Sequence, residues 1–304
     1  MASSPARLIP VAQLIVACAL WGGATVISKA LLSSVPPVPL LALQLAPSAA
    51  VLWLAVVLTK SAAPPRALIA PIALLGALNP GLSYTLVLFG LSTVSASVVT
   101  LMWAAEPVLI FGLAVLWLRE PASGRMIAIL AVGLAGVVLV TNVTGGGRVI
   151  AADGLGLMLV LAAVLCCAFY TVLSRKISDS VDPLFTVAIQ QTAGLAWAAL
   201  LWIALSAFGE PGQLSVLTPA TLAAAALSGL LYYAAAYWLY LSALRSVPAS
   251  MAGAYFNLIP AFGVTMAFAF LGESLAWVQW VGAALILVSA LTLVRSMTGR
   301  EGHG

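Results

Sequence analysis

The sequence predicts an all-α polytopic membrane protein with ten transmembrane helices, and three observations support this fold class. The chain has 304 residues, of which 63% are apolar and only 7% are charged, whereas soluble domains are typically about 25% charged. Its apolar stretches reach the roughly 20 residues that a membrane-spanning helix needs. The chain also repeats itself along its length. A soluble protein with so few charges could not cover its surface, so lipid must surround most of the chain.

Charged residues, prolines and glycines divide the chain into ten apolar segments. The first segment exceeds the roughly 7–15 apolar residues of a signal-peptide core, and it has a counterpart in the second half, so we expect it to be a span. The predicted spans are 8–31, 38–59, 67–91, 95–118, 124–142, 154–174, 183–207, 219–243, 249–271 and 276–295.

The basic residues indicate how the spans are oriented. With a cytoplasmic N-terminus, only Lys29 and Arg148 lie outside, and an even number of spans returns the C-terminus to the cytoplasm. The cytoplasmic side then holds Arg7, Lys60, Arg66, Arg119, Arg125, Arg175, Lys176, Arg245, Arg295 and Arg300. This bias follows the positive-inside rule. The net charge of +4 is therefore a topology signal, and we expect no nucleic-acid partner.

An internal repeat relates the two halves of the chain. Residues 90–97 resemble residues 243–250 at an offset of 153, and an offset of 146 pairs Gln44 with Gln190. Further identical pairs at the offset of 153 are Gly76 and Gly229, Tyr84 and Tyr237, Pro107 and Pro260, and Glu120 and Glu273. We therefore expect two five-helix repeats, residues 1–147 and 148–304. Since five is odd, the repeats must be inserted in opposite orientations, a plan that places the substrate of a transporter between them at mid-membrane.

Several short motifs resemble the EamA-type members of the drug/metabolite transporter superfamily. They are Trp21-Gly22-Gly23 in the first span, Glu106-Pro107 in the fourth, and Arg119-Glu120 and Gly272-Glu273 at span ends. The resemblance extends through both repeats, and it implies a ten-helix carrier of amino acids and other small metabolites in a bacterial cytoplasmic (inner) membrane. Many relatives have an Arg early in spans 2 and 7, where this chain has Gln44 and Gln190. The resemblance therefore does not imply an anionic substrate.

Glu106 is the only acidic residue well inside a predicted span. A carboxylate there costs at least ~2.5 kcal/mol, so intramembrane ionisable groups are functional candidates. Burial disfavours the charged form, which suits a group that exchanges protons or pairs with a substrate amine. In the alternative interpretation Glu106 is structural, because Pro107 frees the carbonyl of Trp103 and Glu106 could satisfy that carbonyl.

Aromatic and amide side chains are expected to line the same cavity as Glu106. Trp103 lies three residues before Glu106, on the same helical face, and its repeat partner is Phe256. Packing between helices is the alternative for the aromatic residues, and hydrogen bonding across helices is the alternative for the glutamines. The candidate substrate-binding or coupling residues are Glu106, Trp103, Tyr84, Asn79, Tyr237, Trp238, Phe256, Asn257, Trp21, Gln44 and Gln190.

The remaining features favour a carrier over other classes of membrane protein. An enzyme would need an acid–base pair, a metal cluster or a phosphate cradle, and the sequence has no motif for any of them. A channel would need a ring of charges or carbonyls, and the single acidic residue Glu106 makes a poor ring. We expect no metal or cofactor, because the three cysteines lie in apolar stretches and resemble small hydrophobic residues. Gly133 and Gly136 of span 5, and Gly282 with Ala283 of span 10, resemble small-residue packing surfaces, so we expect these spans to serve as scaffold or as the contact of a homodimer.

The leading hypothesis is therefore a secondary transporter of a small-molecule substrate in a lipid bilayer. It would export amino acids with hydrophobic or aromatic side chains by alternating access through a cavity between the repeats. The alternative is a broad-specificity drug carrier or a nucleobase/nucleoside-type carrier of the same fold.

Reporter fusions test the predicted orientation. Because ten of the twelve basic residues are assigned to the cytoplasm, fusions after Lys60 and Arg300 should be active as cytoplasmic reporters, and a fusion after Arg148 should be active as a periplasmic one. A periplasmic C-terminus would overturn both the orientation and the even number of spans.

Overall fold

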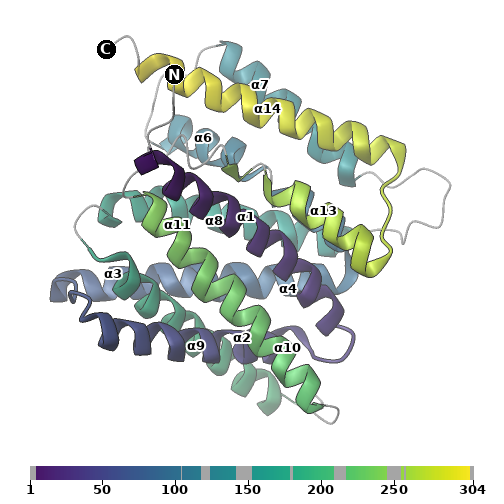
Figure 1. The fold of residues 1–304 in the computed structure, drawn as a ribbon. Helices are drawn as coiled ribbons and strands as arrows, with labels where there is room; N and C mark the ends of the chain where they lie inside the picture. The colour runs from purple at the N-terminus through teal and green to yellow at the C-terminus, as the bar shows by residue number, and fades with distance from the viewer. Residues whose placement is uncertain are drawn as a thin grey trace.

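The computed structural model describes residues 5–103, 105–117, 124–141, 153–178, 181–208, 217–244, 255–256 and 258–301. Within these ranges all regular structure is helical (Figure 1). Six helices are long and apolar enough to cross a membrane, and four shorter apolar helices lie at the positions of predicted spans 4, 5, 9 and 10. The predicted all-helical membrane fold is confirmed. The predicted boundary between residues 147 and 148 lies outside the described residues.

The helices follow the predicted spans closely, with some spans divided. The first half contains α1 (Pro5–Leu31), α2 (Pro37–Thr59), α3 (Arg66–Gly76), the π-helical turn η1 (Ala77–Leu82), α4 (Ser83–Thr93), α5 (Ala96–Trp103), α6 (Glu106–Trp117) and α7 (Gly124–Thr141). The second half contains α8 (Gly154–Ser178), α9 (Pro183–Ala207), α10 (Pro219–Gly229), the π-helical turn η2 (Leu230–Ala235), α11 (Ala236–Leu244), α13 (Leu258–Leu271) and α14 (Trp277–Glu301).

Local sequence explains where α9 begins. Asp182 is the N-cap residue, and its side chain accepts hydrogen bonds from the backbone N–H groups of Leu184 and Phe185. Pro183 follows at the first helical position, where its missing N–H has no intrahelical partner to lose. The predicted span 183–207 coincides with this helix.

Spans 3 and 8 were predicted as continuous helices, and the structure corrects this. Both are interrupted by a π-helical turn, at 77–82 and 230–235, two positions separated by the repeat offset of 153. In η1 the backbone of Asn79 leaves the helical region, with φ −145° and ψ 113°, because a proline follows and disfavours a helical conformation. No proline occurs in η2, which contains Tyr232 and Tyr233.

The predicted weakness beside Pro107 is confirmed, because span 4 is divided at that point. Helix α5 ends at Trp103 and α6 begins at Glu106. Proline has no N–H to donate to the carbonyl four residues earlier, which is that of Trp103. The backbone turns tightly there, with the N–H of Ala105 donating to the carbonyl of Met102 at 3.0 Å.

The contacts between helices have the symmetry of two inverted repeats. Helix α1 packs against α11 and α13, and its counterpart α8 packs against α4 and α6. In the same way α2 packs against α10, while α9 packs against α3. The pairs α2–α9 and α7–α14 join equivalent helices of the two halves, and α5–α13 joins the equivalent spans 4 and 9. When each helix is replaced by its counterpart in the other half, the same contacts therefore recur. Because each half has five spans, the pseudo-two-fold axis that relates the halves lies in the membrane plane.

Two equivalent helix crossings depend on glycine. Gly76 of α3 lies against the backbone of Gln190 in α9, and Gly229 of α10 lies against the backbone of Gln44 in α2. A Cβ atom at either glycine would overlap main-chain atoms of the neighbouring helix. The two glycines are equivalent in the repeat, as are the two glutamines, so the same close approach is built twice.

The small residues of spans 5 and 10 form a contact inside the chain. Helices α7 and α14 lie side by side along one edge of the molecule (Figure 1). A Cβ added to Gly136 would lie 2.8 Å from the carbonyl oxygen of Gly282, and one added to Gly282 would lie 2.7 Å from that of Gly136. A homodimer through spans 5 and 10 would therefore have to use other faces of these helices.

Alanine substitutions test the glycine crossings. Gly76→Ala and Gly229→Ala should each lower the free energy of unfolding by about 1–3 kcal/mol, because the added methyl group forces the two helices apart. Gly112→Ala is the matched control, since it lies in α6 with open space around its Cβ position and alanine favours the helix. Thermal unfolding in detergent measures the difference. Equal midpoints for the Gly76 and Gly112 variants would contradict the close approach.

Candidate functional site

A cavity lies between the two halves, lined by residues of both. The space that it encloses, including its opening toward solvent, is about 470 Å³. The lining residues are Trp21, Asn79, Tyr84, Trp103, Glu106, Cys167, Tyr170, Thr171, Tyr232, Tyr237, Tyr240, Phe256 and Ile259. None of these described lining residues is Lys, Arg or His.

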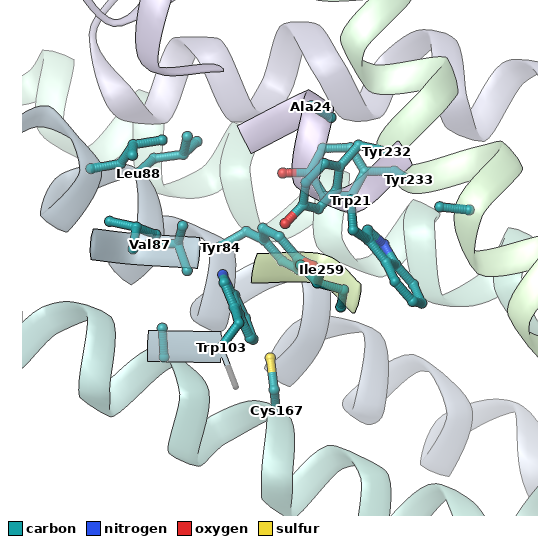
Figure 2. Close-up of a cluster of buried hydrophobic side chains, with 14 of the residues drawn as sticks. Trp21, Ala24, Tyr84, Val87, Leu88, Trp103, Cys167, Tyr232, Tyr233 and Ile259 are labelled. Atoms are coloured by element: carbon teal, nitrogen blue, oxygen red, sulfur yellow. The ribbon is translucent and has the colours of Figure 1, made fainter. Parts of the chain in front are cut away.

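Aromatic rings surround Tyr84 of α4. Its ring is stacked with Trp103 of α5 at a centroid distance of 6.0 Å, and it meets Tyr232 and Tyr233 of η2 edge to face at 5.1 and 5.0 Å. In Figure 2 these rings converge on one region, with Cys167 pointing toward it from its helix. Such geometries contribute about 0.5–1.5 kcal/mol per pair beyond the burial of apolar area.

A second group of rings surrounds Trp21 of α1. Its indole meets Tyr237, Tyr240 and Phe256 at centroid distances of 5.4, 5.5 and 5.6 Å, in edge-to-face orientations. These rings come from α1, α11 and the residues just before α13, so this wall of the cavity joins the first span of one half to two spans of the other.

A hydrogen-bond network links the two halves across the cavity. The hydroxyl of Tyr237 donates to Oδ1 of Asn79 at 3.1 Å, and Ser83 donates to the same oxygen at 3.0 Å. The hydroxyls of Tyr84 and Tyr237 are 3.2 Å apart. Because a tyrosine hydroxyl has one proton and that of Tyr237 goes to Asn79, Tyr84 is the donor to Tyr237. The helix interruption at Asn79 thus anchors equivalent tyrosines of both repeats.

Glu106 lies at the first position of α6 and is 7% exposed. Its Oε1 accepts a hydrogen bond from the hydroxyl of Thr171 on α8 at 3.2 Å. A buried carboxylate without a counter-charge is costly in a membrane. The described lining offers no basic side chain, so no counter-charge for this carboxyl group lies among those residues.

The structure brings seven of the predicted site residues together around one cavity and places three, Trp238, Gln44 and Gln190, outside its lining. Glu106, Trp103, Tyr84, Asn79, Tyr237, Phe256 and Trp21 line it. Trp238 does not, and is 45% exposed, because consecutive residues of a helix point about 100° apart and its neighbour Tyr237 faces inward. Asn257 lies outside the described residues.

The two predicted glutamines are buried at the helix crossings, away from the cavity. Nε2 of Gln44 donates to the hydroxyls of Ser28 and Ser228, both at 2.9 Å. Oε1 of Gln190 accepts from the hydroxyl of Tyr170 at 2.9 Å. Both glutamines therefore form hydrogen bonds across helices, which was the alternative interpretation of these residues. Gln190 does not line the cavity itself, but its partner Tyr170 does.

Several lining residues were not among the predicted site residues, although the repeat offsets point to three of them. The offsets pair Trp21 with Cys167, Asn79 with Tyr232 and Glu106 with Ile259, and both members of each pair line the cavity. The pairs Tyr84–Tyr237 and Trp103–Phe256 do so as well. The missed residues are Cys167, Tyr170, Thr171, Tyr232, Tyr240 and Ile259. The cavity therefore straddles the pseudo-two-fold axis.

Comparison with known proteins identifies the family. Residues 8–142 and 154–295 each match the EamA-like transporter family, and these stretches coincide with the two five-helix halves. The chain belongs to the EamA-like transporter family. It is thus an integral membrane transporter with two EamA repeats, and the family is one of transporters rather than enzymes.

Relatives of this EamA-like transporter occur in bacteria. The chain is 27% identical over 228 residues to the uncharacterized transporter YvbV of Bacillus subtilis (strain 168), covering 74% of this chain and 72% of the relative. It is 27% identical over 226 residues to an uncharacterized transporter of Clostridium kluyveri, covering 72% and 70%. The fold is also shared by a protein of known crystal structure, with a TM-score of 0.64 and 18% identity, covering 97% of this chain and 99% of that one.

Thiol labelling tests whether the cavity admits water. With Cys18 and Cys166 replaced by alanine, a small aqueous thiol reagent should modify Cys167, which lines the cavity. The control exchanges Cys167 for Val and Val164 for Cys, moving the thiol by about one turn of α8 to a fully buried position, where it should stay unmodified. Reaction of Cys167 with lipid-soluble reagents alone would show that it faces packed protein.

Proposed function

We propose that this EamA-like transporter exports small amphipathic metabolites, in particular amino acids with hydrophobic or aromatic side chains. Transport proceeds by alternating access through the cavity between the repeats, in a bacterial cytoplasmic (inner) membrane. One observation carries the proposal: within the described lining, Glu106 is the only carboxyl group, and it sits among aromatic rings with no basic side chain. This environment suits a ligand with an amine and an apolar body.

The chemistry of the cavity is asymmetric although its geometry is symmetric, and this asymmetry would orient the ligand. Glu106 and Thr171 form a polar part of the lining, while Trp21 and Phe256 form an aromatic part. An ammonium group would pair with the carboxylate, with cation–π attraction from nearby rings adding about 0.5–2 kcal/mol. An apolar side chain would then lie against the indole.

Two buried donors support an acceptor group on the same ligand. Nε1 of Trp21 and Nε1 of Trp103 are buried and have no hydrogen-bond partner among the described residues. Buried donors normally have a hydrogen-bond acceptor, and a carboxylate or carbonyl oxygen of a bound ligand would be the missing acceptor. An amino acid carries both the amine and the acceptor.

Glu106 also suits proton coupling. It holds either a proton or the substrate amine, since the uncompensated carboxylate is the costly state in this environment. A proton taken up from outside would release the amine, and a new substrate from the cytoplasm would displace the proton. Export would thereby be driven by proton entry.

The alternative function is a broad-specificity drug carrier or a nucleobase/nucleoside-type carrier. The excess of aromatic rings over fixed polar groups in the lining supports it, because stacking tolerates many planar ligands. Competition by a panel of amino acids, nucleosides and planar drugs for one labelled ligand on purified protein separates the two. The homodimer through α7 and α14 stays a prediction that cross-linking in membranes would test.

Substitution of Glu106 tests the proposed coupling site. Glu106→Gln keeps the shape and can still accept from Thr171, but it cannot titrate. Proton-driven export from proteoliposomes should fall at least about tenfold, since losing a hydrogen bond to a charged group removes about 1.5–3 kcal/mol, and the pH dependence should flatten.

Two variants complete this test. Thr171→Val removes the hydroxyl but leaves the carboxyl group, so it should retain the pH dependence while binding more weakly. An unchanged rate and pH profile for Glu106→Gln would reduce Glu106 to a structural partner of the break at Pro107.

A further inference from the structure

Lys29 and Glu273 connect four helix ends on one side of the cavity. Lys29 lies near the end of α1, and its Nζ donates to the carbonyls of Leu91 and Val94, at 2.7 and 2.8 Å. Those carbonyls belong to the last turn of α4 and to the residue that follows it. A cation at the C-terminal end of a helix is stabilised by the partial negative charge there.

Glu273 makes the complementary contact with the next helix. It follows α13, and its Oε1 accepts from the backbone N–H of Ala96 at 2.9 Å, while Oε2 accepts from the backbone N–H and the hydroxyl of Ser97 at 2.8 and 2.7 Å. The carboxylate thereby caps the N-terminus of α5 from a different repeat. Charge-assisted hydrogen bonds of this kind are about twice as strong as neutral ones, and Glu273 also attracts Lys29.

These contacts, named here the Lys29–Glu273 clasp, lie at one end of the cavity. Lys29 is eight residues beyond Trp21 in α1, or ~12 Å along the axis. Ala96 begins the helix that ends at Trp103, or ~10 Å away. Both displacements point to the same side, since α1 runs toward the clasp and α5 runs from it. The distribution of basic residues predicts that this side is outside.

A tightly packed layer separates the clasp from the cavity. Gly22, next to Trp21, lies so close to α13 that an added Cβ would be 2.7 Å from the backbone nitrogen of Gly263. A Cβ on Gly263 would in turn overlap the side chain of Thr100 in α5. Helices α1, α13 and α5 therefore pack closely against one another between the cavity and the clasp.

We propose that the Lys29–Glu273 clasp is the outer gate of the transporter. Both of its contacts join the pair α1–α13 to the pair α4–α5, so opening toward the outside requires that these two pairs separate and that the clasp breaks. Lys29 and Glu273 thus set the balance between the two access states without touching substrate. This role depends on alternating access and on no particular substrate.

Labelling of Cys167 from each side of the membrane tests the gate without any substrate. In a chain with Cys18 and Cys166 replaced by alanine, a membrane-impermeant cationic methanethiosulfonate is added to right-side-out or inside-out vesicles. Glu273→Gln and Lys29→Met should each raise the labelling rate from outside about tenfold and lower it from the cytoplasmic side, because the outward-open state gains population. Lys29→Arg, which keeps the charge and the donors, should label as the parent does.

Asp153→Asn is the matched control. It removes a carboxylate that also accepts from a backbone N–H at a helix N-terminus, that of Leu155 in the following helix, α8, so neither labelling rate should change. A protein that is merely destabilised would label faster from both sides. Such parallel increases, or unchanged rates from outside for both Glu273→Gln and Lys29→Met, would overturn the gate. Since no transport is measured, failure of the proposed substrate class would leave this result intact.

Discussion

Backbone polar groups within a bilayer must find partners inside the protein, and the position of the cavity follows from this constraint. The described helices depart from regular α geometry at η1, at η2 and between Trp103 and Glu106, and all three places border the cavity. Irregular backbone is tolerated there because neighbouring side chains and the cavity itself supply partners. At Asn79 the interrupted helix turns a side-chain oxygen toward two hydroxyl donors. The breaks therefore shape the site as well as the helices.

The repeat makes the geometry of the site symmetric, whereas evolution of the two halves has made its chemistry asymmetric. Tyr84 and Tyr237 are identical and hydrogen-bonded to each other near the axis. Away from the axis the equivalent residues differ, as Glu106 and Ile259 do. A symmetric framework permits two equivalent access states, because each half can adopt the conformation of the other. The asymmetric lining is where the two halves differ, because Glu106 has an apolar counterpart in Ile259.

Sequence alone predicted the spans, the repeat and most of the cavity residues, because hydropathy and repeat offset are local or additive properties of a chain. It predicted neither π-helical turn: Pro80 lies within η1, but both spans were expected to be continuous, and no proline marks η2. It placed Gln44 in the site because a buried amide resembles a binding group, whereas its burial depends on Gly229, far along the chain. It placed Trp238 there because one residue of error rotates a side chain out of the cavity.

Lys29 shows how a topology signal can also be a structural element. Counted as a charge, it is one of two basic residues assigned to the outside, against the general bias. Its ammonium group is partly buried and needs the two carbonyls at the end of α4 and the nearby charge of Glu273. Those groups are together only while α1 and α13 lie against α4 and α5. The cost of leaving a cation unpaired near the membrane therefore favours the arrangement in which α1 and α13 lie against α4 and α5.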